Sequence, residues 1–75
     1  MIVIHAAFPI DPTAFGDAIE LADELVTRSN REDGTIEYRA ATDIEDGSIL
    51  RFFERYEDEA AFEAHTRTDH FQRFE

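Results

Sequence analysis

The sequence has 75 residues, enough for one small domain, and a chain of this size buries only about 60% of the surface exposed by its unfolded form. The absence of cysteine excludes disulfides, thiolate metal sites and cysteine redox chemistry. With 18 acidic residues against 7 basic ones, the net charge is −11, so neither nucleic acid nor an anionic membrane surface is expected as a partner.

The first predicted element is a strand over residues 1–8. Alternate residues from Ile2 to Phe8 form one face, and Val3, His5 and Ala7 form the other. Both faces are largely apolar, so we expect both to be covered in the folded protein.

A helix is predicted to follow this strand. Asp11 is a suitable N-cap and Pro12 suits the first helical position. From Phe15 to Val26, apolar residues recur at spacings of three and four, which predicts one apolar stripe along the helix. The helix should end near residues 29–30, before a turn at residues 32–34.

Two more strands are predicted over residues 35–42 and 48–56. The loop between them ends in Asp46-Gly47, a strong hairpin signal. On the first of these strands, alternation places Ile36, Tyr38 and Ala40 on one face. On the second, it places Leu50, Phe52, Glu54 and Tyr56 on one face.

The C-terminal region is predicted to be helical in two pieces. Asp58 can cap a helix that carries His65, and Thr68 or Asp69 can cap a short second turn that carries His70. The predicted order is β-α-β-β-α with an antiparallel sheet. This is an α+β, ferredoxin-like order with the last strand missing.

The C-terminal half resembles a known family. Glu-Arg-Tyr-Glu-Asp-Glu-Ala-Ala-Phe at 54–62 runs into His65, Thr68, His70 and Phe71, and Glu-Asp-Gly-Thr-Ile-Glu-Tyr precedes it at 32–38. This ordered set resembles the antibiotic biosynthesis monooxygenase family of dimeric α/β-barrel proteins, over essentially the whole chain. The resemblance implies a homodimer whose two sheets pack together, with a pocket between sheet and helices in each protomer.

The resemblance also implies a range of activities. Some members oxidise quinols or polyketide phenols with O₂ and no cofactor, some degrade haem, and others isomerise small signalling metabolites. The haem-degrading branch uses an Asn, a Trp and a His where this sequence has Ala6 or Ala7, His65 and Glu75. We therefore expect neither haem nor any other cofactor.

His65 and His70 are the predicted catalytic residues. A cofactor-free oxygenase needs a base to form the phenolate or enolate that reacts with O₂, and an apolar cavity that keeps this anion dry. Five residues apart, the two histidines share no face of an unbroken helix, but a break at residues 68–69 would bring both to one pocket. The alternative is that they pack or hydrogen-bond at the helix end.

Aromatic residues are the predicted substrate-binding set. Tyr38 and Tyr56 could orient a substrate hydroxyl, and the pocket would be lined by Phe52, Phe62 and Phe71. Each of these side chains is also compatible with ordinary core packing.

The remaining charged and metal-ligating residues are given structural roles. Glu54 lies on a strand face that should be covered, so we expect either a raised pKa or a partner such as Arg39 or Arg55, for example in an ion pair at the dimer interface. Arg51 and Arg55 are predicted to form cross-strand or intersubunit ion pairs with Glu37. His5 is interpreted as a core or interface residue.

No metal site is predicted from the histidines. The three histidines His5, His65 and His70 would form the ligand set, but no short ligand spacing such as His-x-x-x-His supports it.

Two functions are compatible with the sequence. One is a cofactor-free monooxygenase or related isomerase acting on a small phenolic, quinol-like or keto compound. The alternative is a non-catalytic dimeric α/β-barrel protein that binds a small ligand or serves in assembly. An enclosed apolar cavity with a histidine and a tyrosine favours the first, and a cavity filled by phenylalanine favours the second.

The location is expected to be cytoplasmic, because no apolar run approaches the roughly 18–20 residues of a membrane span and no basic region precedes the apolar N-terminus. All basic residues are arginine, and this acidic, lysine-free composition is typical of halophilic proteins. Molar salt screens the self-repulsion of such a surface to within about 3 Å.

Overall fold

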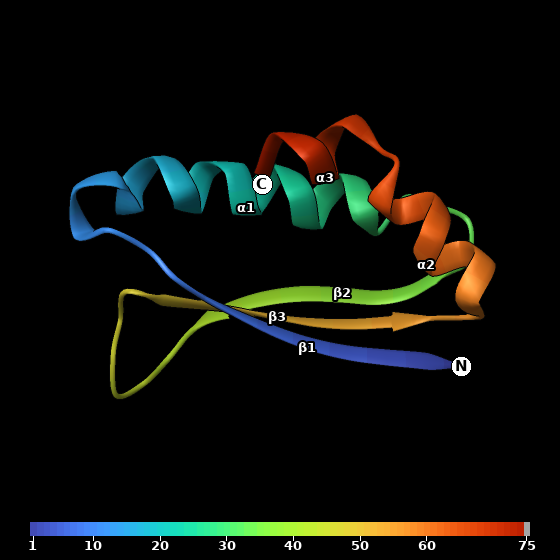
Figure 1. The fold of residues 1–75 in the computed structure, drawn as a ribbon, viewed down its shortest axis with the longest axis horizontal. Helices are drawn as coiled ribbons and strands as arrows, with labels where there is room; N and C mark the ends of the chain where they lie inside the picture. Colours follow the sequence, from blue (N-terminus) through green and yellow to red (C-terminus); the bar gives the residue numbers. More distant parts are fainter. Residues whose placement is uncertain (75) are drawn as a thin grey trace.

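The computed structural model describes residues 1–74, in which one three-stranded sheet carries all the helices on one of its faces (Figure 1). The elements in chain order are β1 (Ile2–Pro9), the 3₁₀ helix η1 (Pro12–Ala14), α1 (Phe15–Ser29), β2 (Thr35–Thr42), β3 (Ile49–Tyr56), α2 (Glu59–Thr66) and α3 (Asp69–Phe74). The strand order is β1-β3-β2, and both strand pairs are antiparallel. The predicted β-α-β-β-α order is confirmed, whereas Glu75, compared above with the haem-degrading branch, lies outside the described residues.

The predicted helix starts are confirmed by their capping hydrogen bonds. Asp11 accepts a hydrogen bond from the backbone N–H of Thr13 at 2.9 Å, although the first turn is 3₁₀ rather than α. Asp58 accepts one from the backbone N–H of Ala61 at 2.8 Å and so caps α2. These bonds satisfy N–H groups that a helix leaves free at its start.

Gly34 determines how closely α2 approaches the turn between α1 and β2. Its φ is +87°, a conformation that other residues rarely adopt. A Cβ added at this position would lie 2.6 Å from Cβ of Ala61, so α2 packs directly on this turn. The turn also carries Glu32, which is thereby held beside the C-terminal helices.

The strand register separates the two faces of the sheet. Glu54 of β3 is paired with Ile4 of β1 and Tyr38 of β2, and all three lie on the helix-covered face. The buried hydrophobic core lies there and comprises Ala22, Leu25, Tyr38, Leu50, Phe52 and Tyr56. On the opposite face Val3 is 69% exposed and Phe53 43% exposed.

Within one chain only one face of the sheet is covered, since α1, α2 and α3 all lie on the same side (Figure 1). That the other face is covered in the folded protein stays a prediction that requires a second copy of the chain. A second difference concerns Ile36, which alternation places with Tyr38 on the covered face. The register shifts between Thr35 and Glu37, so Ile36 is an extra residue in β2 and is 43% exposed. A bulge of this kind interrupts the two-residue alternation on which the prediction depends.

The uncovered face carries one of the predicted cross-strand ion pairs, between Arg55 and Glu37, whereas Arg51 binds Asp43 at 2.9 Å instead. Glu37 binds Nε of Arg55 at 2.8 Å and Nε of Arg39 at 2.5 Å. The hydrogen bond from Arg55 lowers the pKa of Glu37, against the smaller opposing effect of desolvation.

Within residues 1–74, no helix has the length and apolar character needed to cross a membrane.

Candidate functional site

A cavity of about 470 Å³ lies between the helix-covered face of the sheet and the helices. Its sheet side is formed by Ile4, Ala6, Phe8, Tyr38, Phe52 and Glu54, and its helix side includes Leu21, Leu25, Phe62, Phe71 and Phe74. This volume is within the range of small-molecule sites, roughly 300–1,000 Å³. The cavity is therefore large enough for a small aromatic molecule.

Most of the predicted substrate-binding residues reach this cavity. Tyr38, Phe52, Phe62 and Phe71 line it. Tyr56 is fully buried and does not line the cavity. Its hydroxyl donates a hydrogen bond to Glu54, which does line the cavity. The sequence therefore located four of the five lining residues that it proposed.

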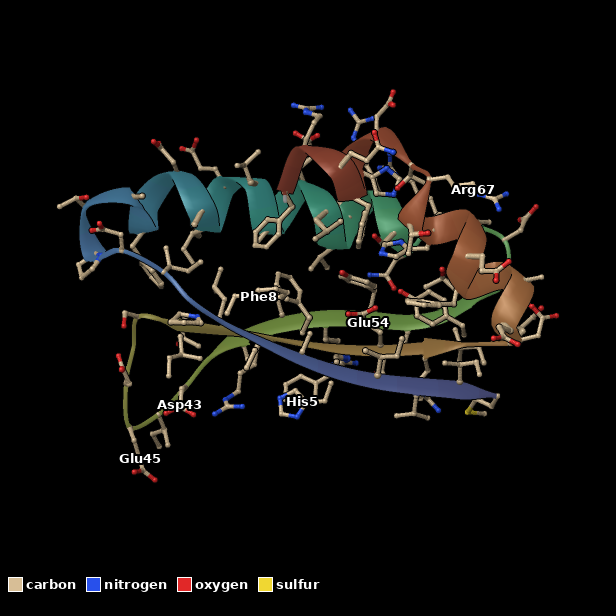
Figure 2. The ribbon with its side chains drawn as sticks, in the orientation of Figure 1. His5, Phe8, Asp43, Glu45, Glu54 and Arg67 are labelled. Atoms are coloured by element: carbon tan, nitrogen blue, oxygen red, sulfur yellow. The ribbon has the colours of Figure 1, made fainter. Side chains whose placement is uncertain are left out.

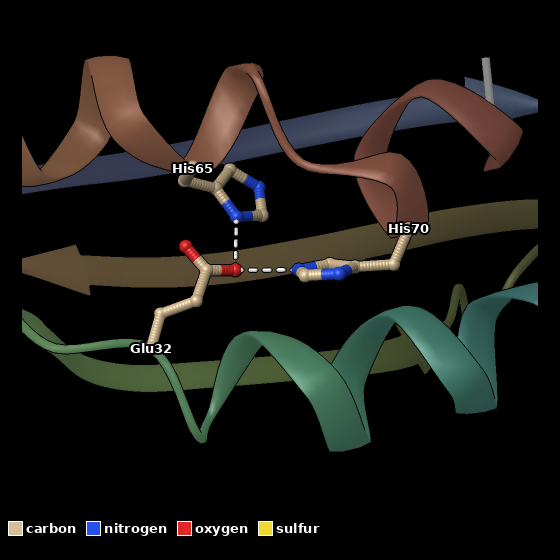
Figure 3. Close-up of side chains that lie close together, drawn as sticks. All are labelled: Glu32, His65 and His70. Atoms are coloured by element: carbon tan, nitrogen blue, oxygen red, sulfur yellow. Dashed lines mark hydrogen bonds and ion pairs between the residues drawn. The ribbon is translucent and has the colours of Figure 1, made fainter.

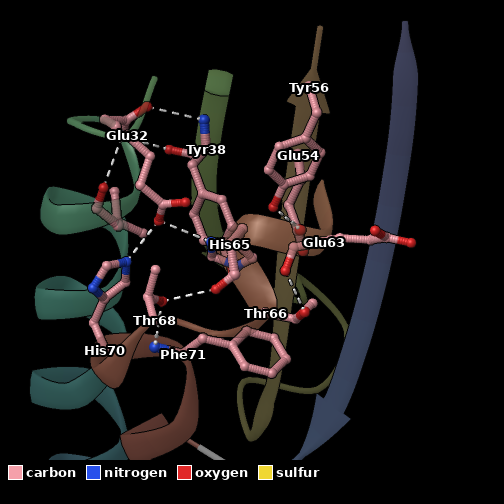
Figure 4. Close-up of polar contacts among 12 residues, drawn as sticks. Glu32, Tyr38, Glu54, Tyr56, Glu63, His65, Thr66, Thr68, His70 and Phe71 are labelled. Atoms are coloured by element: carbon pink, nitrogen blue, oxygen red, sulfur yellow. Dashed lines mark hydrogen bonds and ion pairs between the residues drawn. The ribbon is translucent and has the colours of Figure 1, made fainter. Parts of the chain in front are cut away.

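Glu54 introduces a carboxylate into this apolar cavity. Figure 2 shows Glu54 and Phe8 pointing into the space between the sheet and the helices, with His5 on the opposite side of the sheet. Glu54 is 7% exposed, and its Oε1 accepts a hydrogen bond from the hydroxyl of Tyr56 at 2.6 Å (Figure 4). The structure thus places a carboxylate where the cavity would contact a ligand.

The predicted ion pair between Glu54 and Arg39 or Arg55 at a dimer interface is wrong. Successive side chains of a strand point to opposite faces, so both arginines lie on the uncovered face, where they bind Glu37. Glu54 therefore receives its hydrogen bond from a tyrosine and has no arginine partner among residues 1–74.

The two buried tyrosines are hydrogen-bond donors at neutral pH. Burial raises the pKa of Tyr38 well above its ordinary value, and the negative charge of Glu54 raises it further. The pKa of Tyr56 is also raised, first by burial and then by its hydrogen bond to Glu54. Each phenol therefore keeps its proton, and the hydroxyl of Tyr38 can donate a hydrogen bond to a ligand in the cavity.

His65 and His70 meet at Glu32 (Figure 3). Nδ1 of His65 lies 2.9 Å and Nε2 of His70 lies 2.6 Å from the same oxygen, Oε2 of Glu32. The predicted helix break is present, because α2 ends at Thr66 and α3 begins at Asp69, and it brings the two rings together.

Neither histidine is among the residues that line the cavity. His65 is fully buried behind the cavity wall, with its ring centroid 5.1 Å from that of Tyr38 and 5.1 Å from that of Phe71.

His5, on the uncovered face, stacks on Phe53 at 4.6 Å between ring centroids. It therefore cannot join the other histidines in a metal site.

Glu32, His65 and His70 form a compact group that we call the Glu32 cluster. One ligand atom from each residue lies within 4.8 Å of the other two. Two imidazole nitrogens and one carboxylate oxygen make a donor set suited to a divalent metal ion. Glu32 was not predicted as a ligand, because in the sequence it belongs to the turn at residues 32–34 and to the family-like motif at 32–38, far from both histidines.

Comparisons with known proteins match the whole chain. Residues 1–75 fit the family model described as antibiotic biosynthesis monooxygenase. A Bacillus subtilis (strain 168) protein with the name "Putative monooxygenase YcnE" is 31% identical over 74 residues, which are 99% of this chain and 78% of that protein.

Solved structures are similar over the same span. The crystal structure of an antibiotic biosynthesis monooxygenase superposes with a TM-score of 0.93 at 31% identity, covering 99% of this chain and 78% of that one. PA3566 from Pseudomonas aeruginosa gives a TM-score of 0.90 at 29% identity, covering 96% and 73%. The similarity therefore includes the sheet and helices that enclose the cavity.

Proposed function

The chain belongs to the antibiotic biosynthesis monooxygenase family, and from this premise we propose that it is a cofactor-independent monooxygenase, or a related isomerase, acting on a small phenolic, quinol-like or keto compound. The observation that carries the proposal is the apolar cavity of about 470 Å³ with one carboxylate, Glu54, in its wall. An aromatic substrate fits a lining made largely of aliphatic and phenylalanine side chains, and its acidic hydroxyl needs one polar partner.

The proposed reaction needs little from the protein beyond a base and a dry cavity. A quinol and O₂ together contain the atoms of a hydroxyquinone and one water, and the quinol itself supplies the electrons that reduce oxygen. The protein must remove the hydroxyl proton so that the electron-rich anion can react, and must exclude water from that anion. For an isomerase, the same base would remove a proton beside a carbonyl group.

Glu54 is placed to be the proton acceptor, because its carboxylate lines the cavity and proton transfer needs a reach of about 3 Å. Tyr56 holds this carboxylate through its hydroxyl. Tyr38, which also lines the cavity, would donate a hydrogen bond to a substrate oxygen. His65 and His70, the bases predicted from the sequence, do not line the cavity. They would influence the reaction only indirectly, through the residues that do line it.

Oxygen uptake and substrate consumption, both measured on a panel of quinols, phenols and keto compounds, test the proposal, because an isomerase would convert a keto compound without taking up oxygen. Glu54→Gln keeps the size of the side chain and removes its basicity, so turnover should fall by about 10²–10⁴-fold while the protein stays folded. His65→Gln and His70→Gln are assayed beside it. If a histidine variant loses turnover and Glu54→Gln retains it, the base is a histidine and the role of Glu54 is wrong.

The same panel separates the enzyme from the non-catalytic alternative. A parent protein that binds an aromatic compound in the cavity but consumes no member of the panel would support a ligand-binding protein. Catalytic turnover must also exceed the spontaneous oxidation of the quinol, which is measured with heat-denatured protein.

We further propose that two copies of the chain pair through the uncovered face of the sheet. What supports this is the exposure of apolar side chains there, with Val3 69% and Phe53 43% exposed. Pairing would remove this surface from water and add to the stability of a small core.

A further inference from the structure

We propose that the Glu32 cluster binds a divalent transition-metal ion such as Zn²⁺. Its three members come from separate segments, because Glu32 lies in the turn after α1, His65 near the C-terminus of α2 and His70 in the first turn of α3. Their ligand atoms nevertheless converge within 4.8 Å of one another (Figure 3). Three nitrogen and oxygen ligands, with further positions left for water, are typical of open zinc and iron sites.

The charge of the cluster favours a cation. The side chain of Glu32 is only 15% exposed, and its ion-pair partners among residues 1–74 are the two histidines alone. No arginine pairs with this carboxylate among the described residues, so it has no permanent counter-charge, and a buried charge without one is costly. The net charge of −11 also raises the local concentration of cations around the molecule.

Metal binding requires both the imidazole rings and the carboxylate to move. Without a metal, Oε2 of Glu32 takes the position between the rings, 2.9 Å from Nδ1 of His65 and 2.6 Å from Nε2 of His70. An ion bonded at about 2.0–2.2 Å holds tetrahedral ligand atoms about 3.4 Å apart. The ligand atoms of the cluster lie within 4.8 Å of one another, so the two ring nitrogens must approach each other by up to about 1.4 Å, and the oxygen must withdraw by under about 1 Å. Glu32 lies in a turn, where its side-chain torsions can provide this movement.

One feature of the cluster limits the affinity. Nε2 of His65 is buried without a hydrogen-bond partner among the described residues. A metal-bound histidine usually donates its other ring N–H to an acceptor, and loss of such a partner typically costs 10–100-fold in metal affinity. We therefore expect weaker binding than at a structural zinc site with four protein ligands.

Metal binding here is separate from the proposed chemistry in the cavity. Neither histidine lines the cavity, and removal of a hydroxyl proton by Glu54 needs no metal. A bound ion would instead join α2, α3 and the turn before β2. It would thereby fix the wall that contributes Phe62 and Phe71 to the cavity.

The test is calorimetric titration of the chelator-treated 75-residue chain with Zn²⁺, with no substrate present. We expect one ion per chain and an increase in the melting temperature. The absorption spectrum with Co²⁺ should show bands of a nitrogen-ligated ion. His70→Gln, at a side chain 12% exposed, should weaken binding at least tenfold without unfolding the protein. Glu32→Gln should have the same effect.

His5→Gln is the matched control, because it removes a histidine from the opposite face of the sheet. It should leave Zn²⁺ affinity unchanged. If the parent binds no Zn²⁺, or if His70→Gln and Glu32→Gln bind it as tightly as the parent, the proposed site is wrong. Loss of binding in His5→Gln would equally place the ion elsewhere and overturn the assignment.

Discussion

At Gly34 the chain has room for a hydrogen atom but not for a side chain. Two features oppose a side chain at this position: the φ of +87° and the separation of only 2.6 Å between an added Cβ and Cβ of Ala61. Gly34→Ala should lower the free energy of unfolding by about 2 kcal/mol, since it adds backbone strain to a steric clash. The melting temperature should fall by about 8 °C or more.

Gly16 provides the control for this substitution. It lies in α1, and an added Cβ meets nothing within 4 Å. Gly16→Ala should therefore raise stability by about 0.4–1 kcal/mol, because it restricts the unfolded chain. If Gly34→Ala melts at the parent temperature, the close packing of α2 on the turn is not a constraint on the fold.

Individual residues were predicted best where alternation alone decides their position. Alternation along β3 correctly placed Glu54 on the covered face, but the choice of an arginine partner overlooked that Arg39 and Arg55 point the other way. The meeting of His65 with His70 followed from a local helix break. The contact of both histidines with Glu32 could not be predicted, because Glu32 lies 33 residues before His65 in the chain.

The junction between α1 and β2 depends on Asn30, directly after the helix. Its Nδ2 donates to the backbone carbonyls of Val26 and Tyr38, both at 2.9 Å, and its Oδ1 accepts from the backbone N–H of Tyr38 at 3.0 Å. Because β2 is an edge strand, this side chain pairs with backbone groups that no neighbouring strand reaches.

Asn30→Ala should lower the free energy of unfolding by about 1–3 kcal/mol, because it leaves backbone groups of Tyr38 without partners. Thermal melts measure the change. Arg31→Ala, which truncates the exposed neighbouring side chain, should shift the melting temperature little. Equal melting temperatures for the two variants would mean that water replaces the asparagine at no cost.

At the scale of elements, the sequence predicts what is encoded within a few residues. Asp58 and Asp46 accept local hydrogen bonds from the backbone N–H groups of Ala61 and Ser48, and the helix start and the hairpin before β3 are both confirmed. The bulge at Ile36 and the bridge from Asn30 to Tyr38 depend on how β2 meets β3 and α1. Contacts between segments distant in sequence have no comparable local signal.

The cavity is a property of the whole molecule. Its position between sheet and helices follows from the family resemblance, and four of its lining residues were named from sequence. Phe8 and Phe74 come from opposite ends of the chain and complete its aromatic lining. Their rings are 6.0 Å apart at the centroids, a contact that only the folded chain makes.

The uncovered sheet face leads to a prediction about the size of the molecule in solution. Each chain carries a net charge of −11, so pairing two chains is opposed by repulsion that salt weakens. The screening length falls from about 10 Å at 0.1 M salt to about 3 Å at 1 M. Light scattering at 1 M KCl should therefore give twice the chain mass of 8.7 kDa, and the melting temperature should rise with salt.

Phe53→Glu places a carboxylate in the middle strand of the uncovered face and should shift the protein to a monomer. Ile44→Glu is matched in charge change, and it lies in the β2–β3 loop at a residue that is 100% exposed. It should leave the mass unchanged. A parent protein that stays at 8.7 kDa in 1 M KCl would contradict pairing, because the charge repulsion is then screened and no longer opposes it, while the apolar face is still in water.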